Sequence, residues 1–174
     1  MSMYDNFRID DVKSIRLHVE NNSEHIDKIV GDIINPYCKD LDDYVKFIKE
    51  GFQGGNNPPT NEELEDYCLN LSALIYFASG MCEQLGVRDD ISKAVWKEMY
   101  NTKRQESSGT VADKDSSAEL SSQQEQLTNI CYSRAYKTMK AKVENAQELL
   151  SSCKKVLSHR MQEMSLTHCA SNIC

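Results

Sequence analysis

The chain has 174 residues, of which 40% are hydrophobic and 27% charged, within the range of soluble globular proteins. Only 7 Gly and 3 Pro are present, too few turn-forming residues for an all-β sandwich. No apolar run reaches the roughly 18 residues of a membrane span, so we expect no membrane association. The net charge is −7, yet residues 101–174 hold 10 basic and only 8 acidic side chains, which permits local binding of a polyanion.

Residues 1–57 form an acidic region in which we expect short amphipathic helices. Apolar residues recur there at helical spacing in two runs, Ile26, Ile29, Val30, Ile33 and Ile34, then Leu41, Val45, Ile48 and Phe52. Because proline interrupts helices, Pro36 is expected to divide the two runs. The Gly-, Asn- and Pro-rich stretch GFQGGNNPPTNEE then marks a break.

Residues 58–105 predict the first long helical arm, which Thr60 and Glu63 open as a capping box. Its apolar positions advance by a mean of about 3.5 residues, the spacing of a seam that packs against a partner helix. These positions are Leu64, Cys68, Leu71, Ile75, Ala78, Cys82 and Leu85. We expect a break near Gly86, after which Asp89 or Asp90 caps a second piece containing Ile91, Val95 and Met99.

Residues 106–122 lose this pattern and predict a polar flexible loop, either mobile or partly helical. Residues 123–165 predict a second long helix with a basic outer face, followed by a C-terminal tail at 166–174. Its seam positions are Tyr132, Tyr136, Met139, Val143, Ala146, Leu150, Cys153 and Leu157. We therefore predict an all-α fold, a long antiparallel, coiled-coil-like helical hairpin with a short N-terminal helical region covering one end.

The sequence offers no constellation of residues typical of catalysis, metal binding or cofactor binding. It lacks a glycine-rich phosphate loop, G-x-S-x-G and H-E-x-x-H, so we expect that the protein is not an enzyme. Cys153 and His159 do not share a helix face, and His168, Cys169 and Cys174 have no partner pair elsewhere. Seven scattered cysteines without C-x-x-C indicate reduced thiols and a cytoplasmic location.

The basic residues of the two arms admit two interpretations. Between residues 130 and 164 there are 7 basic and 3 acidic side chains, which either solubilise the flanks of the seam or contact phosphates. The candidate phosphate contacts are Lys93, Lys97, Lys103 and Arg104, and, as a second group, Lys154, Lys155 and Arg160. Trp96, Tyr100, Tyr132 and Tyr136 are candidates for stacking on bases, although the last two lie on the seam, which favours core packing.

Several phrases together resemble a known group of proteins. They are DIINPYCKDLDDYVKFIKE, LIYFASGMCEQLGVRDDISKAVWKEMYN, GTVADKD and SRAYKTMKAKVENAQELLSSCKKVLSHRMQE. The chain resembles small helical proteins, mostly uncharacterised, encoded by tailed bacteriophages. Residues from about 62 to 164 are distantly similar to the phage recombination mediator family typified by UvsY.

That resemblance implies a non-enzymatic protein that binds single-stranded DNA and assembles into a ring-like homo-oligomer. Such a mediator helps load a RecA-type recombinase onto DNA coated by single-strand binding protein, in the cytoplasm of the bacterial host. By resemblance, Lys97 is the best match to a DNA-contacting residue, with Lys93, Lys103 and Arg104 nearby. The chain departs from the family in its acidic N-terminal region and in Met99, where a second basic residue is expected.

Two further interpretations remain open on the sequence. In the first, the seams only form the hairpin and a homo-oligomer, or hold a partner helix, so that the protein is a structural or adaptor module without nucleic-acid binding. In the second, the protein is a phage inhibitor of a host nuclease or defence system.

Overall fold

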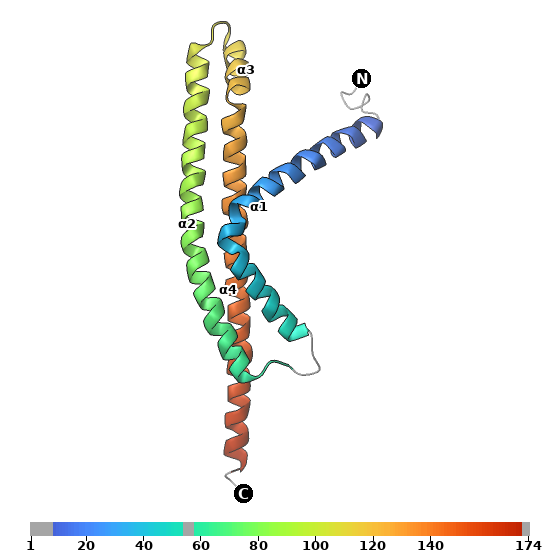
Figure 1. Cartoon of the computed structure of the whole chain (residues 1–174), viewed down its shortest axis with the longest axis vertical. Helices are drawn as coiled ribbons and strands as arrows, with labels where there is room; N and C mark the ends of the chain where they lie inside the picture. The colour runs from blue at the N-terminus through green and yellow to red at the C-terminus, as the bar shows by residue number, and fades with distance from the viewer. Residues whose placement is uncertain (1–8, 54–57, 172–174) are drawn as a thin grey trace.

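A computed structural model describes the backbone of residues 9–53 and 58–171, and side chains from Arg16 to Leu166 with His18 and 54–57 left out. Four helices and no strand occupy these ranges, which confirms the predicted all-α class. They are α1 (Ile9–Gln53), α2 (Asn61–Glu106), α3 (Val111–Ser121) and α4 (Gln123–Ser171). Helices α2 and α4 lie side by side as a long antiparallel hairpin, with α3 at its closed end and α1 across its side (Figure 1).

The core of the hairpin follows the predicted seam on α2. Leu64, Leu71, Ile75, Ala78, Cys82 and Leu85 are all buried. Cys68 is only half-buried, and its neighbour Tyr67 is buried in addition to the predicted set. The 3.5-residue spacing therefore identifies the packed face of α2, because side chains at that spacing stay on one side of the helix.

On α4 the predicted seam is displaced at its beginning. Met139, Val143, Ala146 and Cys153 are buried as expected, and Leu150 and Leu157 are half-buried. Before Met139, however, the buried residues are Cys131 and Ala135 rather than Tyr132 and Tyr136. From Cys131 to Val143 the buried residues are four apart, so this stretch follows a wider spacing than the 3.5 residues of the predicted seam.

Helix α2 begins as predicted but does not break near Gly86. The Thr60 hydroxyl accepts a hydrogen bond from the Glu63 backbone N–H at 3.2 Å, and the Glu63 carboxylate accepts from the Thr60 N–H at 2.7 Å. The helix then continues through Gly86 and Asp89 to Glu106. A Cβ at Gly86 would come within 3.2 Å of the Tyr136 ring on α4, so the missing side chain makes room for a tyrosine.

The region predicted as a polar loop is mostly helical. Only residues 107–110 connect α2 to α3, and Thr110 caps α3 through reciprocal hydrogen bonds with Asp113. Gly109 has φ = 118°, a conformation that glycine adopts without steric cost. A single residue, Ser122, separates α3 from α4, and α4 extends beyond the expected end at 165 to Ser171.

Helix α1 is one continuous helix of 45 residues with Pro36 inside it, not two short helices. It bends where it meets the hairpin (Figure 1), and the bend is explained by proline, which cannot donate the backbone hydrogen bond of its turn. Val30, Ile34, Cys38, Leu41 and Ile48 bury its packed face. Its first part points away from the hairpin (Figure 1), so α1 covers the side of the hairpin rather than one end.

A polar contact fastens α1 to α4 beside this apolar face. The Lys142 ammonium lies 2.7 and 2.6 Å from the two carboxylate oxygens of Asp42, and the Cys38 thiol donates to Asp42 at 3.4 Å. Near the same crossing, Arg88 on α2 donates to the Tyr37 hydroxyl at 3.3 Å. No helix among the described residues has an apolar stretch long enough to cross a bilayer.

Candidate nucleic-acid interface

The seven basic residues predicted to contact DNA lie in two separate groups. Lys93, Lys97, Lys103 and Arg104 are on the last turns of α2, at the closed end of the hairpin. Lys154, Lys155 and Arg160 are on α4 toward the opposite end (Figure 1). At a rise of about 1.5 Å per residue, the two groups are on the order of 40 Å apart along α4. The structure thus does not bring them together into one surface.

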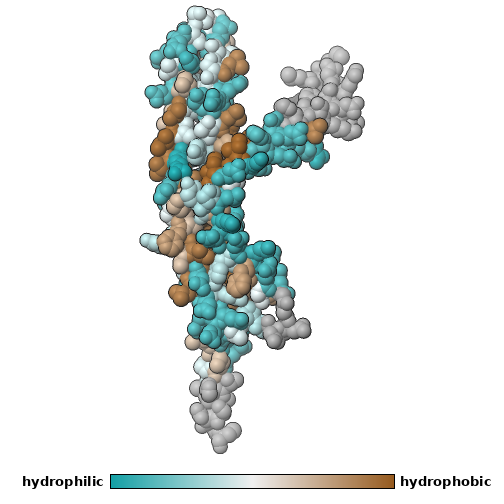
Figure 2. Space-filling view, in the orientation of Figure 1, coloured by the Kyte–Doolittle hydropathy of each residue, from teal (hydrophilic) through white to brown (hydrophobic). Residues whose placement is uncertain are grey.

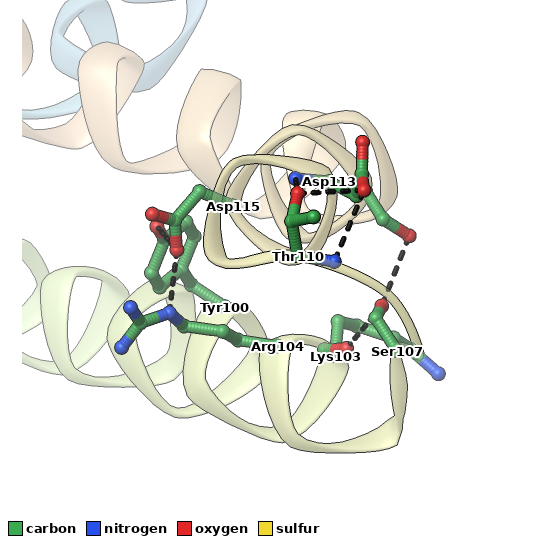
Figure 3. A network of polar contacts seen from close by, with 8 residues as sticks. Tyr100, Lys103, Arg104, Ser107, Thr110, Asp113 and Asp115 are labelled. Carbon is green, nitrogen blue, oxygen red and sulfur yellow. Dashed lines mark hydrogen bonds and ion pairs between the residues drawn. The ribbon is translucent and has the colours of Figure 1, made fainter.

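Three of the seven cations are engaged by partners within the chain. Lys103 forms an ion pair with Glu106 at 2.8 Å, and a hydrogen bond to this carboxylate raises the pKa of Lys103. Arg104 pairs with Asp115 of α3 at 2.5 Å (Figure 3). Arg160 donates to the backbone carbonyl of Pro59. A phosphate would have to compete with these partners, so the three are weaker candidates than the sequence suggested.

The other four cations, Lys93, Lys97, Lys154 and Lys155, have exposed side chains. None of them has a hydrogen bond or ion pair with the residues that the structure describes. Lys93 and Lys97 are four residues apart on α2, so they project from the same side of the helix one turn apart. Two neighbouring ammonium groups without a carboxylate between them suit successive phosphates of one strand.

A network of polar contacts holds α3 against the end of α2 (Figure 3). The Tyr100 hydroxyl donates to Asp115 at 3.3 Å, next to the Arg104 contact with the same carboxylate. The Ser107 hydroxyl contacts the Lys103 carbonyl at 2.7 Å and the Ser117 hydroxyl at 3.0 Å. The network fixes the position of the α3–α4 junction relative to α2.

An open cavity of about 450 Å³ lies between α2 and that junction. Its walls come from three helices: Trp96, Lys97, Tyr100 and Asn101 of α2, Glu119 of α3, and Ser122 and Gln126 at the start of α4. Trp96 and Tyr100, two of the predicted stacking residues, are half-buried here beside Lys97. The sequence could not indicate the cavity, because its far wall depends on a helix predicted as a loop.

Tyr132 and Tyr136 of α4, the other two predicted stacking residues, do not line the cavity that contains Trp96. Tyr136 packs against Gly86 in the hairpin, as core packing would require. Tyr132 lines a second cavity, of about 370 Å³, with Arg88, Ile91, Val95 and Thr128. Ile91 and Val95 were expected on a packed helix face, yet 58% and 47% of their surfaces are exposed.

Hydrophobic surface gathers along the hairpin near the place where α1 leaves it (Figure 2). On α2, the exposed residues Val87, Ile91 and Val95 recur at intervals of four, which places them on one side of the helix. A row of this kind is a candidate surface for contact with another protein.

The cysteines of the described residues have raised pKa values. Cys38, Cys68, Cys82, Cys131 and Cys153 are free thiols. Burial raises the pKa of each, and that of Cys38 rises to about 11. No group of three or more His, Cys, Asp or Glu side chains in the described ranges is placed to hold a metal ion. The side chains of His168, Cys169 and Cys174 lie outside those ranges.

Comparisons with models of protein families, with curated proteins and with solved structures find no match for this chain.

Proposed function

We propose that the protein is a non-enzymatic phage recombination mediator that binds single-stranded DNA. The observation that carries the proposal is the pair Lys93 and Lys97, two exposed ammonium groups one helical turn apart with no carboxylate partner among the described residues. Aromatic side chains at Trp96 and Tyr100 line a cavity together with Lys97. Phosphate contacts combined with aromatic side chains are typical of proteins that bind single strands without sequence preference.

The two groups of lysines contribute unequally to this binding. Lys93 and Lys97 are the primary contacts, because Lys97 lines the aromatic cavity and Lys93 lies one helical turn before it, whereas Lys154 and Lys155 form a second group at the other end of the hairpin. The remaining three cations mainly stabilise the fold, because each already has a partner within the chain. The pairs are Lys103 with Glu106, Arg104 with Asp115, and Arg160 with the Pro59 carbonyl. The overall charge of −7 opposes non-specific binding, so the interaction depends on these local cations.

The partners of the mediator follow from the resemblance described above. They are a RecA-type recombinase and single-strand binding protein, and the mediator helps to load the first onto DNA coated by the second. The acidic surfaces of residues 1–60 engage these proteins, since this region holds 11 acidic and 7 basic side chains. A homo-oligomer would place several copies of the lysine pair along one strand.

Charge reversal of the lysine pair tests the proposal. We expect Lys93→Glu with Lys97→Glu to lower the affinity for a labelled oligo-dT at least tenfold at low salt, measured by fluorescence anisotropy. The slope of log K against log salt should fall in magnitude by about 1.4, because each phosphate contact to a single strand contributes about 0.7. The matched control is Lys28→Glu with Lys49→Glu, the same charge change at exposed positions of α1.

The wild-type protein and the control variant are expected to bind alike. Equal binding by the Lys93→Glu, Lys97→Glu variant would move the contact elsewhere on the chain. Undetectable binding of oligo-dT by the wild-type protein at low salt would rule out the mediator.

The second candidate function is a structural or adaptor oligomer without nucleic-acid binding. The exposed apolar row of Val87, Ile91 and Val95 favours it, because such a surface suits another helix. In that case reversal at Lys93 and Lys97 leaves function unchanged, and substitutions in the apolar row abolish it.

A further inference from the structure

The lining of the cavity between α2 and the α3–α4 junction includes a buried hydroxyl, that of Ser122, without a hydrogen-bond partner among the described residues. Ser122 is only 1% exposed, and its hydroxyl has no hydrogen-bond partner among the described residues. The Ser122 backbone, by contrast, is fully used: its N–H donates to the Ala118 and Glu119 carbonyls, and its carbonyl accepts from Gln126. Buried hydroxyls are nearly always hydrogen-bonded, so this one is available to a polar atom that enters the cavity.

The walls of the cavity suit a flat, nitrogen-containing ring. Trp96 and Tyr100 supply aromatic surface, and the amides of Asn101 and Gln126 each carry both a donor and an acceptor. Bases of single-stranded nucleic acids are bound in this way, by stacking on aromatic side chains and by hydrogen bonds to their edges. The volume of about 450 Å³ is within the range of small-molecule sites.

The charges at the cavity select a nucleotide within a strand rather than a free anion. The Lys97 ammonium lines the cavity and is exposed, so it can contact the phosphate attached to a bound base. Glu119 lines the same cavity, and its carboxylate accepts a hydrogen bond from a ring N–H or an amino group of a base but repels a phosphate. A base inside and its phosphate beside Lys97 satisfy both groups.

We propose that this cavity receives one unpaired base of a bound DNA strand, stacked on Trp96 and Tyr100 with its edge toward Ser122, Asn101 and Gln126. The inference rests on the proposed single-strand binding and extends it from phosphate contacts to base contacts. A paired base is held in the duplex stack, so the cavity selects single-stranded over double-stranded DNA. The Tyr100 hydroxyl remains bonded to Asp115, which keeps this ring in place.

The only tryptophan in the sequence is Trp96, so intrinsic fluorescence reports directly on the cavity. We expect oligo-dT to quench the emission in a saturable manner. An abasic deoxyribose-phosphate oligomer of the same length should leave the emission unchanged and bind at least about fivefold more weakly by anisotropy, since stacking of one base contributes that much or more. A duplex of the same length should behave as the abasic oligomer does.

Two substitutions at Trp96 separate stacking from folding. Trp96→Phe retains an aromatic ring and should keep most of the affinity for oligo-dT, whereas Trp96→Leu should reduce it to the level of the abasic oligomer. Circular dichroism checks that both variants retain the helical content of the wild-type protein.

The outcomes distinguish the cavity from the lysine pair. Equal affinity for oligo-dT and the abasic oligomer, with unchanged Trp96 emission, would overturn the base site while leaving phosphate binding intact. Equal loss in Trp96→Phe and Trp96→Leu would also overturn it. If neither oligomer binds at low salt, the proposed function fails and the base site with it.

Discussion

At the scale of single residues, the contact of Cys38, Asp42 and Lys142 shows how polar groups are accommodated at the edge of the core. Cys38 is fully buried, and its thiol donates to the same carboxylate that pairs with Lys142. Burial raises the pKa of Cys38 from 9.0 to about 11, the negative charge of Asp42 adds to the rise, and the Lys142 ammonium opposes it. The thiol therefore stays protonated in the folded protein at any pH near neutrality.

This pKa shift predicts a loss of stability in alkaline solution. The folded-state pKa of Cys38 lies above its unfolded value of 9.0, so the stabilising contribution is complete below about pH 9 and is lost as pH rises through about 11. We expect the free energy of unfolding, measured in urea at a series of pH values, to decline over this interval. Because the other buried thiols act in the same direction, Cys38→Ala should make the decline shallower without abolishing it.

The slope of the free energy of unfolding against pH, compared between wild type and Cys38→Ala, is independent of the packing lost with the smaller side chain. Cys38→Ala also removes packing, which lowers stability by the same amount at every pH. Curves for wild-type and variant protein that run parallel from pH 7 to 11 would show that Cys38 does not carry the shift.

Residue contacts were the least predictable part of the candidate site. The sequence indicates that Lys103, Arg104 and Arg160 are basic and near a helix surface, but not that Glu106, Asp115 and Pro59 lie within reach. Asp115 reaches Arg104 only because α3 is helical and folds back on α2. Pairing of this kind depends on tertiary structure, which periodicity does not encode.

At the scale of helices, α2 shows that a glycine does not by itself end a helix. Gly80 and Gly86 both lie inside α2, and each lacks the side chain that would favour helix over coil. Their surroundings differ: a Cβ at Gly80 would meet nothing within 4 Å, whereas one at Gly86 would approach the Tyr136 ring. The sequence predicted a break near Gly86 and none at Gly80, and it did not indicate the contact with Tyr136.

Substitution by alanine is expected to change the free energy of unfolding differently at the two glycines. We expect Gly80→Ala to raise the free energy of unfolding by about 1 kcal/mol, the difference in helix propensity between the two residues. For a chain of this length that corresponds to a rise in melting temperature of about 2–4 °C. Gly86→Ala should gain less, or lose stability, because Tyr136 must move. Thermal unfolding followed by circular dichroism compares them, and an equal gain in both would contradict the contact at Gly86.

The other two departures at this scale have separate causes. Residues 106–122 were expected to be a loop, mobile or partly helical, because Ser, Thr and Asp dominate residues 107–117 and favour caps and turns. In the structure Thr110 with Asp113 caps a helix there. Helix α1 was expected to stop at Pro36, but both halves pack on the hairpin through Val30, Ile34, Cys38 and Leu41. Tertiary packing therefore holds the helix together across a residue that weakens it locally.

At the scale of the whole molecule, the hairpin could be predicted because it depends only on two repeating apolar rows. The cavity and the distribution of free cations could not, because they depend on how four helices meet. The exposed apolar row of Val87, Ile91 and Val95 also could not be predicted, because its exposure depends on which helices pack against α2, and no described part of the chain covers it.

We expect the protein to self-associate through that row. Sedimentation velocity should show a species larger than the monomer, and Ile91→Asp with Val95→Asp should shift it toward the monomer, because charged side chains are costly to bury at an interface. Leu69→Asp, an exposed position elsewhere on α2, serves as the control and should leave the distribution unchanged. A monomer across the accessible concentrations would exclude the homo-oligomer.

The capped turn at residues 107–110 has a kinetic consequence. The contacts of Ser107 with Ser117 and of Arg104 with Asp115 join α2 to α3. These residues are close in the chain, so ordering them requires closing only a short loop. Arg160 and Pro59, at the other end, are about 100 residues apart in sequence. Contacts between α2 and α4 should therefore form first near the turn and last at the open end during folding. On unfolding, the open end near Arg160 should separate first.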